Sequence, residues 1–180
     1  MNSTVELGKL TFVPVAGATD LVGEPVRRLV DGAPDGLWVS DIDPGLADTA
    51  AFCQQYGIGL DVSANCVVVE ARRAERTWYA ACVVLATTRA DINGVVRKHL
   101  DARKISFAAM ETAVAHTDME YGGITPIGLP QGWPLLIDRQ VVDQPRVIIG
   151  SGVRGSKLLA ETALLATLPG AEVLDITKPA

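Results

Sequence analysis

The sequence places Cys66-Val-Val-Val69 and Trp78-Tyr-Ala-Ala-Cys-Val-Val-Leu-Ala86 on either side of the charged segment Arg72-Arg-Ala-Glu-Arg76. This arrangement predicts a β-hairpin whose tip carries the charged side chains. Both runs are almost unbroken in apolar character, which indicates strands covered on both faces. An adjacent antiparallel pair in mid-chain argues against a regular βαβ series and favours an α+β or mixed-sheet domain.

Predicted helices and strands follow one another irregularly on both sides of this hairpin. Upstream, the pattern predicts an extended segment, a helix and a strand, over 10–15, 22–30 and 37–43. Asp43-Pro44 then begins a second helix that ends at Gly57. Downstream, the predicted elements are a helix after Asp91, a strand over 105–108, a helix over 110–115, a loop over 121–133, strands over 135–138 and 146–150, a helix over 161–168 and a strand over 171–176.

Length, composition and charge limit the class of protein. The chain has 180 residues, 48% apolar side chains and a net charge of -5, which fits one globular domain over 1–180. It shows no membrane span and no signal-peptide pattern, so we expect a cytoplasmic protein that does not bind membranes. Residues 1–62 carry nine acidic and three basic side chains, a net of -6, and 63–180 carry twelve and thirteen, a net of +1. We therefore expect any polyanion to contact the second part.

The cysteines and histidines show no pattern typical of a metal or cofactor site. Cys53, Cys66 and Cys82 contain no Cys-x-x-Cys pair, and the last two lie in apolar runs that predict a raised thiol pKa and low reactivity. His99 and His116 lack the spacing of a metal-binding pair. We therefore expect no metal and no cofactor.

Gly150-Ser-Gly-Val-Arg-Gly155 matches the pattern G-x-G-x-x-G and follows a predicted strand, with Asp175 twenty residues further on. Taken literally, this is a dinucleotide-binding fingerprint. Only 25 of the 180 residues follow Gly155, which leaves no second mononucleotide half, so a strand-to-helix turn without a nucleotide is an alternative. A third interpretation is that the backbone N–H groups, together with Ser151, Arg154 and Lys157, hold an anion or a polarised carbonyl.

Gly122-Gly-Ile-Thr-Pro-Ile-Gly128, earlier in the chain, is also a glycine-rich loop. In chain order it is the first glycine loop, and Gly150–Gly155 is the second. Its paired glycines let a substrate approach the backbone closely, and Pro126 stiffens the turn. In ester hydrolysis, an N–H donor from such a loop can stabilise the developing oxyanion by roughly 3 to 4 kcal/mol. Two such loops, each beside a strand, predict a shared pocket.

Charged side chains supply further candidate contacts. Asp138 ends a predicted strand, where it would either orient a substrate amine or cap the following turn. The basic side chains form either a phosphate-binding face or a solvated surface, and they are Arg72, Arg73, Arg76, Arg97, Lys98, Arg103, Lys104, Arg154 and Lys157.

Five motifs in a fixed order give the chain a family resemblance. They are ADING (90–94), LDARKISFA (100–108), GGITPIGLP (122–130), LLID (135–138) and IIGSGVRGSK (148–157). Over about 45–177 the sequence resembles the YbaK-type aminoacyl-tRNA deacylase family, which is related to the editing domain of bacterial prolyl-tRNA synthetases. The resemblance implies a mixed, mainly antiparallel twisted sheet flanked by helices. It also implies hydrolysis of the ester of a mischarged tRNA without a metal or a diffusible cofactor.

The chain departs from this family at its functional lysine. The family has Lys-Thr-Leu-Val on the first central strand, whereas here the stretch reads Ser63-Ala-Asn-Cys-Val-Val-Val69, which puts Asn65 or Cys66 in that place. Asn65 can hydrogen-bond a substrate but supplies neither a cation nor a base. Asp118 replaces the family's glycine after Thr117. Any charge recognition or catalysis carried by the lysine is therefore lost or moved elsewhere.

The leading hypothesis is a free-standing, editing-type deacylase whose partner is the acceptor end of an aminoacyl-tRNA. The resemblance and the two loops assign catalytic positions to Gly122, Gly123, Thr125, Gly150, Ser151 and Gly152, and substrate binding to Asn65, Pro126, Asp138, Arg154 and Lys104. One alternative is a non-enzymatic binder of aminoacyl or amino-acid-like ligands, which the missing lysine favours. Another is dinucleotide binding through Gly150–Gly155.

Overall fold

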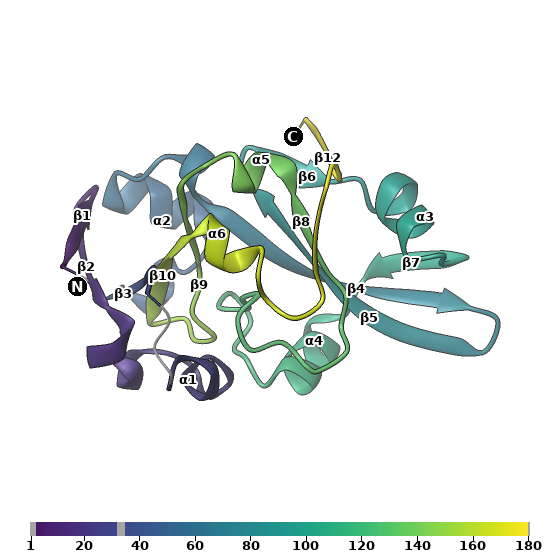
Figure 1. The fold of residues 1–180 in the computed structure, drawn as a ribbon, viewed down its shortest axis with the longest axis horizontal. Helices are drawn as coiled ribbons and strands as arrows, with labels where there is room; N and C mark the ends of the chain where they lie inside the picture. The colour runs from purple at the N-terminus through teal and green to yellow at the C-terminus, as the bar shows by residue number, and fades with distance from the viewer. Residues whose placement is uncertain (1–2, 32–34, 180) are drawn as a thin grey trace.

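Strands dominate the part of the chain that the computed structural model describes, residues 3–31 and 35–179 (Figure 1). Their bounds are β1 Val5–Leu7, β2 Leu10–Pro14, β3 Leu37–Asp41, β4 Ala64–Arg73, β5 Arg76–Leu85, β6 Thr88–Ala90, β7 Lys104–Phe107, β8 Leu135–Asp138, β9 Arg146–Gly150, β10 Ser156–Glu161, β11 Ala171–Leu174 and β12 Thr177–Pro179. The helices are α1 Glu24–Val30, α2 Thr49–Tyr56, α3 Arg97–His99, α4 Met110–Thr117, α5 Arg139–Val142 and α6 Thr162–Leu165. Short 3-10 turns lie at Val15–Gly17, Thr19–Leu21, Pro44–Leu46 and Leu60–Val62, and a π-helical segment at Ile92–Val96.

The described strands form two five-stranded sheets and a two-stranded one. The first sheet has the order β1-β2-β3-β10-β9 and is antiparallel throughout. The second has the order β11-β8-β5-β4-β7, in which β11, β8 and β5 run parallel and β5, β4 and β7 antiparallel. A parallel bridge between Ser63 and Ile148 links the sheets beside β4. The predicted α+β class with a mixed, mainly antiparallel sheet is confirmed.

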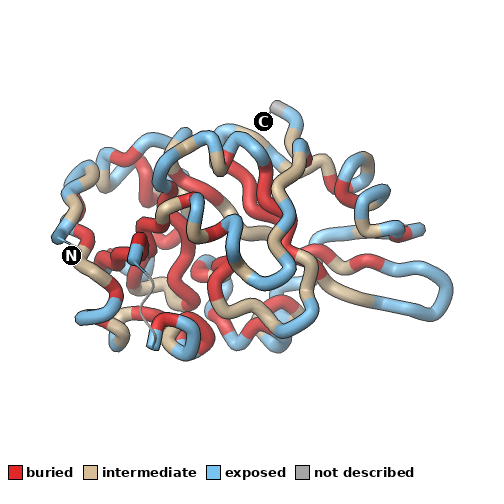
Figure 2. The backbone as a smooth tube through the Cα atoms, in the orientation of Figure 1, coloured by how far each residue is buried: buried red, intermediate tan, exposed pale blue. Residues whose placement is uncertain are grey.

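The central hairpin is the longest pairing in the molecule. Arg73 faces Arg76 directly, so Ala74 and Glu75 make the turn, and Ala74 adopts a positive φ of 54°. The predicted hairpin with a charged tip is confirmed, and its strands extend further toward the tip than the apolar runs indicate. Figure 2 shows the tip exposed and the base of the hairpin buried, where residues 80–85 lie beneath other elements. Because both faces of β5 are covered by other elements there, its sequence does not alternate between apolar and polar residues.

The glycine-rich segment after β9 leads into a strand rather than a helix. Lys157 pairs with Gly150 and Glu161 with Arg146, so β9 and β10 form an antiparallel hairpin closed by residues 151–155. A dinucleotide fingerprint requires a helix whose N-terminus meets the pyrophosphate. The interpretation of Gly150–Gly155 as a dinucleotide site was therefore wrong, as was that of a strand-to-helix turn. The predicted helix over 161–168 shortens to α6, because β10 includes Glu161 and the helix ends at Leu165.

The second predicted helix begins later than Asp43-Pro44. Asp43 accepts a 2.9 Å hydrogen bond from the Gly45 N–H and so caps only the 3-10 turn at Pro44–Leu46. Asp48 is the N-cap of α2, because its carboxylate accepts from the Ala51 N–H. The helix ends as predicted at Gly57, whose φ of 67° favours glycine. Within the described residues, none of the helices has the length and apolar character needed to cross a membrane.

The main core lies where the two sheets and the short helices meet. One cluster of buried apolar side chains joins both sheets to α1, α5 and α6, and includes Val26, Val39, Val83, Ile137, Val141, Ile149, Leu158 and Leu165. A second cluster packs Phe52 of α2 against the first sheet, and a third packs Val96 and Ile176 against the other side of the second sheet. The first of these clusters therefore packs the two sheets against each other.

Candidate functional site

A cavity of about 580 Å³ opens where β4 of the second sheet faces β9 and β10 of the first. Elements far apart in sequence build its walls. The lining residues include Asp48 and Thr49 at the start of α2, Asn65 to Val68 of β4, and Phe107 at the end of β7. They also include Tyr121, Gly122 and Ile124 of the first glycine loop, Gly150 of β9 and Lys157 of β10. Three of the predicted site residues, Asn65, Gly122 and Gly150, thus line one hollow.

The two glycine-rich loops lie side by side at this cavity. The Gly152 N–H donates a 2.7 Å hydrogen bond to the Gly123 carbonyl oxygen, and the Glu120 N–H donates to Gly152 at 2.9 Å. A methyl group at Gly150 would lie 2.6 Å from the carbonyl oxygens of both Gly123 and Ile124, so the backbones approach as closely as glycine permits. The loops therefore form a shared rim, as the paired motifs predict.

Not every amide of this rim is available to a substrate. The Gly123 N–H donates to the Glu120 carbonyl at 2.9 Å, and the Gly152 N–H is used by Gly123. The Gly123 donor closes a turn within its own loop, and the Gly152 donor links the two loops. The structure therefore does not support the expectation that these two residues direct their N–H groups at an oxyanion.

Asn65 presents a polar group from β4 into the cavity. Its Oδ1 accepts a 2.6 Å hydrogen bond from the Thr49 hydroxyl, which fixes the amide plane. The amide nitrogen Nδ2 makes no hydrogen bond to the described residues, so it can donate to a ligand. The motif comparison pointed to Asn65, but Thr49 carries no signal of its own, because only the fold brings α2 against β4.

The edge of β4 adds backbone groups to the same wall. The Ala108 N–H donates to Val68 and the Arg103 N–H to Arg72, so the even-numbered residues of β4 direct their backbone groups toward β7. In an antiparallel ladder this direction alternates strictly, and Cys66 therefore points its N–H and C=O to the same edge. The pairing with β7 stops at Val69, which leaves this edge of Cys66 open at the cavity.

Lys157 places an ammonium group at the cavity from the first sheet. The side chain is buried, with 7% of its surface exposed, and Nζ donates a 3.0 Å hydrogen bond to the Ala47 carbonyl. Nζ also lies 5.3 Å from the centre of the Phe52 ring. Burial lowers the pKa of Lys157. No lysine lies near Asn65 along the chain, but the fold brings Lys157 to the same cavity.

Three predicted residues, Thr125, Pro126 and Ser151, do not line the cavity. Ser151 is buried, and its Oγ lies 2.7 Å from Ser156 Oγ and 3.0 Å from the Ser156 carbonyl oxygen, so it braces the loop from inside. Thr125 is also buried, and its Oγ1 has no hydrogen-bond partner among the described residues. Pro126 borders a separate groove with Pro25. Direct contact of these three with a substrate in the cavity is therefore not supported.

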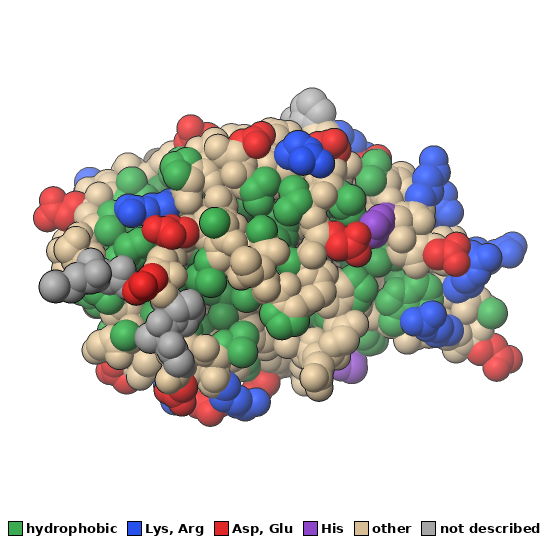
Figure 3. Space-filling view, in the orientation of Figure 1, with side chains coloured by type: hydrophobic (Ala, Val, Ile, Leu, Met, Phe, Trp, Pro, Cys, Tyr) green, Lys and Arg blue, Asp and Glu red, His purple; other side chains and the backbone are tan. Residues whose placement is uncertain are grey.

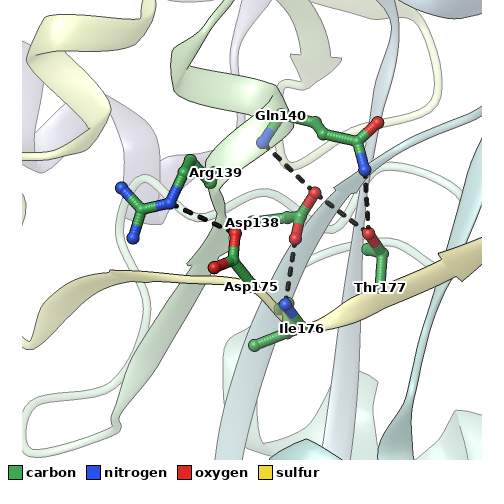
Figure 4. Close-up of polar contacts among 6 residues, drawn as sticks. All are labelled: Asp138, Arg139, Gln140, Asp175, Ile176 and Thr177. Atoms are coloured by element: carbon green, nitrogen blue, oxygen red, sulfur yellow. Dashed lines mark hydrogen bonds and ion pairs between the residues drawn. The ribbon is translucent and has the colours of Figure 1, made fainter.

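The Asp138 carboxylate is engaged in hydrogen bonds with α5 and with the chain at the start of β12 (Figure 4). Its carboxylate accepts hydrogen bonds from the N–H groups of Gln140 and Ile176 and from the Thr177 hydroxyl, at 3.3, 3.0 and 3.1 Å. These contacts cap α5 and tie the end of the chain to β8. The structure thus matches the capping alternative and does not support the expected contact of Asp138 with a substrate amine.

Arg154 and Lys104 lie outside the cavity, in different settings. The Arg154 guanidinium donates to the carbonyl oxygens of Tyr121 at 3.0 Å and Pro44 at 3.1 Å, so it fastens the first glycine loop to the segment before α2. Lys104 of β7 borders a shallow hollow with Arg72, Arg97 and Arg103. Figure 3 shows Lys and Arg side chains gathered at this end of the molecule. Arg154 therefore holds these two segments together, and Lys104 belongs to a basic surface.

The cysteine thiols and the possible metal-binding side chains can be compared with the expectations from sequence. Burial raises the pKa of Cys66, and the nearby Cys82 raises it further; burial raises the pKa of Cys82 to about 12. These directions agree with the raised thiol pKa that the apolar runs predict. In residues 3–31 and 35–179, no three His, Cys, Asp or Glu side chains form a group able to hold a metal ion.

Comparison of the sequence with known protein families gives a match. The aminoacyl-tRNA editing domain family matches residues 43–168, a span that contains both glycine loops, β4 and Lys157. The chain belongs to this family. The match also covers the cavity walls from Asp48 to Lys157. A search of curated proteins gave no match.

Solved structures show the same fold. One is described as a candidate trans-editing enzyme for prolyl-tRNA synthetase; it is 19% identical, with a TM-score of 0.72, over 87% of this chain and 99% of that one. Another, described as a hypothetical protein, is also 19% identical, with a TM-score of 0.76, over 86% of this chain and all of the other. At this identity the likeness establishes the fold of the chain.

Proposed function

We propose that this protein is a free-standing deacylase that hydrolyses the ester between a wrongly attached amino acid and the terminal ribose of a tRNA. The observation that supports this proposal most strongly is the cavity itself. It lies inside the editing-domain match and is bordered by both glycine loops and by the open edge of β4. A tRNA substrate would place the protein in the cytoplasm, and the proposed reaction needs no cofactor.

The polar groups of the cavity suit an aminoacyl ester. Asn65 Nδ2 and the Cys66 N–H can donate to the ester carbonyl, and the Cys66 carbonyl can accept from the α-ammonium group. Donors aimed at the oxygen that becomes negative stabilise the transition state more than the ground state. These two groups take over the oxyanion role that Gly123 and Gly152 cannot fill.

The mouth of the cavity suits the terminal nucleotides. Phe107 and Tyr121 line it and remain 63% and 55% exposed. Exposed aromatic rings of this kind provide stacking surfaces for unpaired bases. Lys104 lies three residues before Phe107 on β7, roughly 10 Å away along the strand, so the basic surface can follow the RNA backbone away from the cavity. Attack on the ester is by water, with a ribose hydroxyl of the tRNA as the group that assists it.

The test is incubation of the purified protein with a panel of mischarged tRNAs. We expect release of the amino acid from at least one of them, with correctly charged tRNAs spared. An active editing enzyme serves as the positive control, and circular dichroism confirms that the protein is folded. Absence of deacylation across the whole panel would refute the catalytic proposal.

A binding protein without turnover is the second candidate. The engaged N–H groups of Gly123 and Gly152, together with asparagine at position 65, favour it. A binder would retain an aminoacyl-tRNA in which an amide replaces the ester and would protect the normal ester from hydrolysis. Slower loss of the ester in the presence of the protein would select this candidate.

A further inference from the structure

Lys157 is a buried cation with unused hydrogen-bonding capacity. An ammonium group has three N–H donors, and among the described residues Nζ donates only to the Ala47 carbonyl, at 3.0 Å. No carboxylate of the described residues lies within ion-pair distance of it. Two donors therefore remain for a group that enters the cavity.

The surroundings of Lys157 do not neutralise its charge. The charged or titratable groups that act on it are Asp48 at the start of α2, Cys53 one turn further on and Arg154 of the second glycine loop. Burial is the largest effect and lowers the pKa of Lys157, and Arg154 acts in the same direction, whereas Cys53 and Asp48 favour the charged form. The Asp48 carboxylate itself accepts from the Ala51 N–H. Burying a cation without a paired anion costs free energy. Such a cost is typical of a residue kept for binding or catalysis.

The strand register explains how Lys157 reaches the site. It pairs with Gly150 of β9, which lines the cavity, and its side chain passes beneath Ala47 and Phe52. Thr49 and Asn65 lie on the same cavity wall, joined by their 2.6 Å hydrogen bond. A cation on β10 and an asparagine on β4 thus face one space from opposite sheets.

We propose that Lys157 is the substrate-binding cation of this cavity and that its ammonium group donates to an anionic oxygen of the bound aminoacyl-tRNA. This inference rests on the proposed function and assigns to β10 the charge that the family resemblance expects on β4. Two oxygens of the substrate have this chemistry, a phosphodiester oxygen of the terminal nucleotide and the oxyanion formed on the ester carbonyl.

The experiment compares Lys157→Met with the control Lys9→Met, which removes an exposed lysine outside the cavity. We expect Lys157→Met to lower kcat/KM for the ester at least tenfold, with a melting temperature equal to or above that of the wild type, while Lys9→Met leaves both unchanged. A rise in KM identifies the phosphodiester, and a fall in kcat identifies the oxyanion. An unchanged kcat/KM in Lys157→Met would overturn the inference.

Two further measurements keep the inference testable. If Lys157→Met does not fold, the test is protection of Lys157 from acetylation in the wild-type protein. The ligand is an aminoacyl-tRNA of the panel in which an amide replaces the ester. We expect slower acetylation of Lys157 than in free protein, and an equal rate would overturn the inference. If the wild type cleaves no ester, Lys157-dependent binding of the same amide still supports a binding cation, so the two proposals fail separately.

Discussion

The Thr49 hydroxyl donates a 2.6 Å hydrogen bond to Asn65 Oδ1 and so fixes the amide that faces the cavity. The contact joins the first turn of α2 to the open edge of β4, two elements that meet only through the fold. Because Oδ1 is held by Thr49, Nδ2 points its donors away from that hydroxyl. The pair therefore determines how Asn65 meets a substrate.

Removal of the Thr49 hydroxyl should weaken catalysis without unfolding the protein. In Thr49→Val the shape is kept and the orienting hydrogen bond is lost, a contact worth about 1 kcal/mol. We expect roughly a fivefold fall in kcat/KM for the ester, and a larger fall in Asn65→Ala, measured by release of labelled amino acid. If Asn65→Ala retained wild-type kcat/KM, Asn65 would not be an oxyanion donor.

Gly150→Ala should destabilise the protein strongly. Its methyl group would lie 2.6 Å from two carbonyl oxygens of the other glycine loop, so the backbones must separate. We expect a loss of about 2 to 3 kcal/mol, measured by urea unfolding. Gly17→Ala is the matched control, because no atom lies within 4 Å of its added methyl group, and it should stay within about 0.5 kcal/mol of the wild type. Equal stability of the two variants would contradict the close packing of the loops.

Phe107→Ala should weaken substrate binding rather than folding. The ring is 63% exposed at the cavity mouth, so its removal costs little stability, whereas a lost base-stacking contact costs about 1 to 3 kcal/mol. We expect KM for aminoacyl-tRNA to rise by a factor of five or more while kcat stays within twofold. Leu29→Ala, which removes a 49% exposed side chain from α1, should leave KM unchanged. A normal KM in Phe107→Ala would exclude stacking at this rim.

Replacement of Lys104 should change the salt dependence of binding. A lysine that contacts phosphate contributes about one unit to the slope of log Kd against log salt concentration. We expect Lys104→Ala to lower this slope by about one for tRNA, with the effect similar across tRNA sequences. An unchanged slope, measured by filter binding between low and moderate salt, would place the RNA on another surface.

The pH dependence of stability should reveal the buried charge of Lys157. Burial lowers its pKa in the folded protein below the ordinary 10.5 of the unfolded chain. Between these two values the unfolded chain binds more protons than the folded one, so stability rises with pH. Measured against Lys157→Met, which removes the group, the wild type should gain stability as pH rises through the folded pKa toward 10.5. Asp48, Cys53 and Arg154 are common to both proteins, so a difference that is flat with pH would contradict a desolvated ammonium.

Local sequence patterns predicted most of the sheet. The apolar runs of β4 and β5, the strands β8 and β9 and the helix end at Gly57 follow from residue type and spacing, because each depends on neighbours in the chain. β10 was missed, since a glycine motif that resembles a nucleotide-binding turn favours a helix after it. The antiparallel pairing of this segment with β9 on one side and β3 on the other shows that it is a strand.

The site was predicted less well than the fold, for a physical reason. Glycine loops and family motifs identified the rim, but hydrogen bonding decides which of its amides are available. The Gly123 N–H donates to Glu120 in its own loop, and the Gly152 N–H donates to Gly123 in the other loop. A lysine in sequence is expected at the surface. The burial of Lys157 beneath Ala47 therefore has no local signal and depends on contacts between distant segments.

Deacylation of a mischarged-tRNA panel by the wild-type protein tests the central proposal most directly. The structure supports an ester-binding cavity between the two sheets, and we predict that at least one mischarged tRNA loses its amino acid faster than in buffer, with the rate reduced in Asn65→Ala. If the folded protein left every tRNA in the panel charged while a known editing enzyme cleared it, the cavity would not be a hydrolytic site.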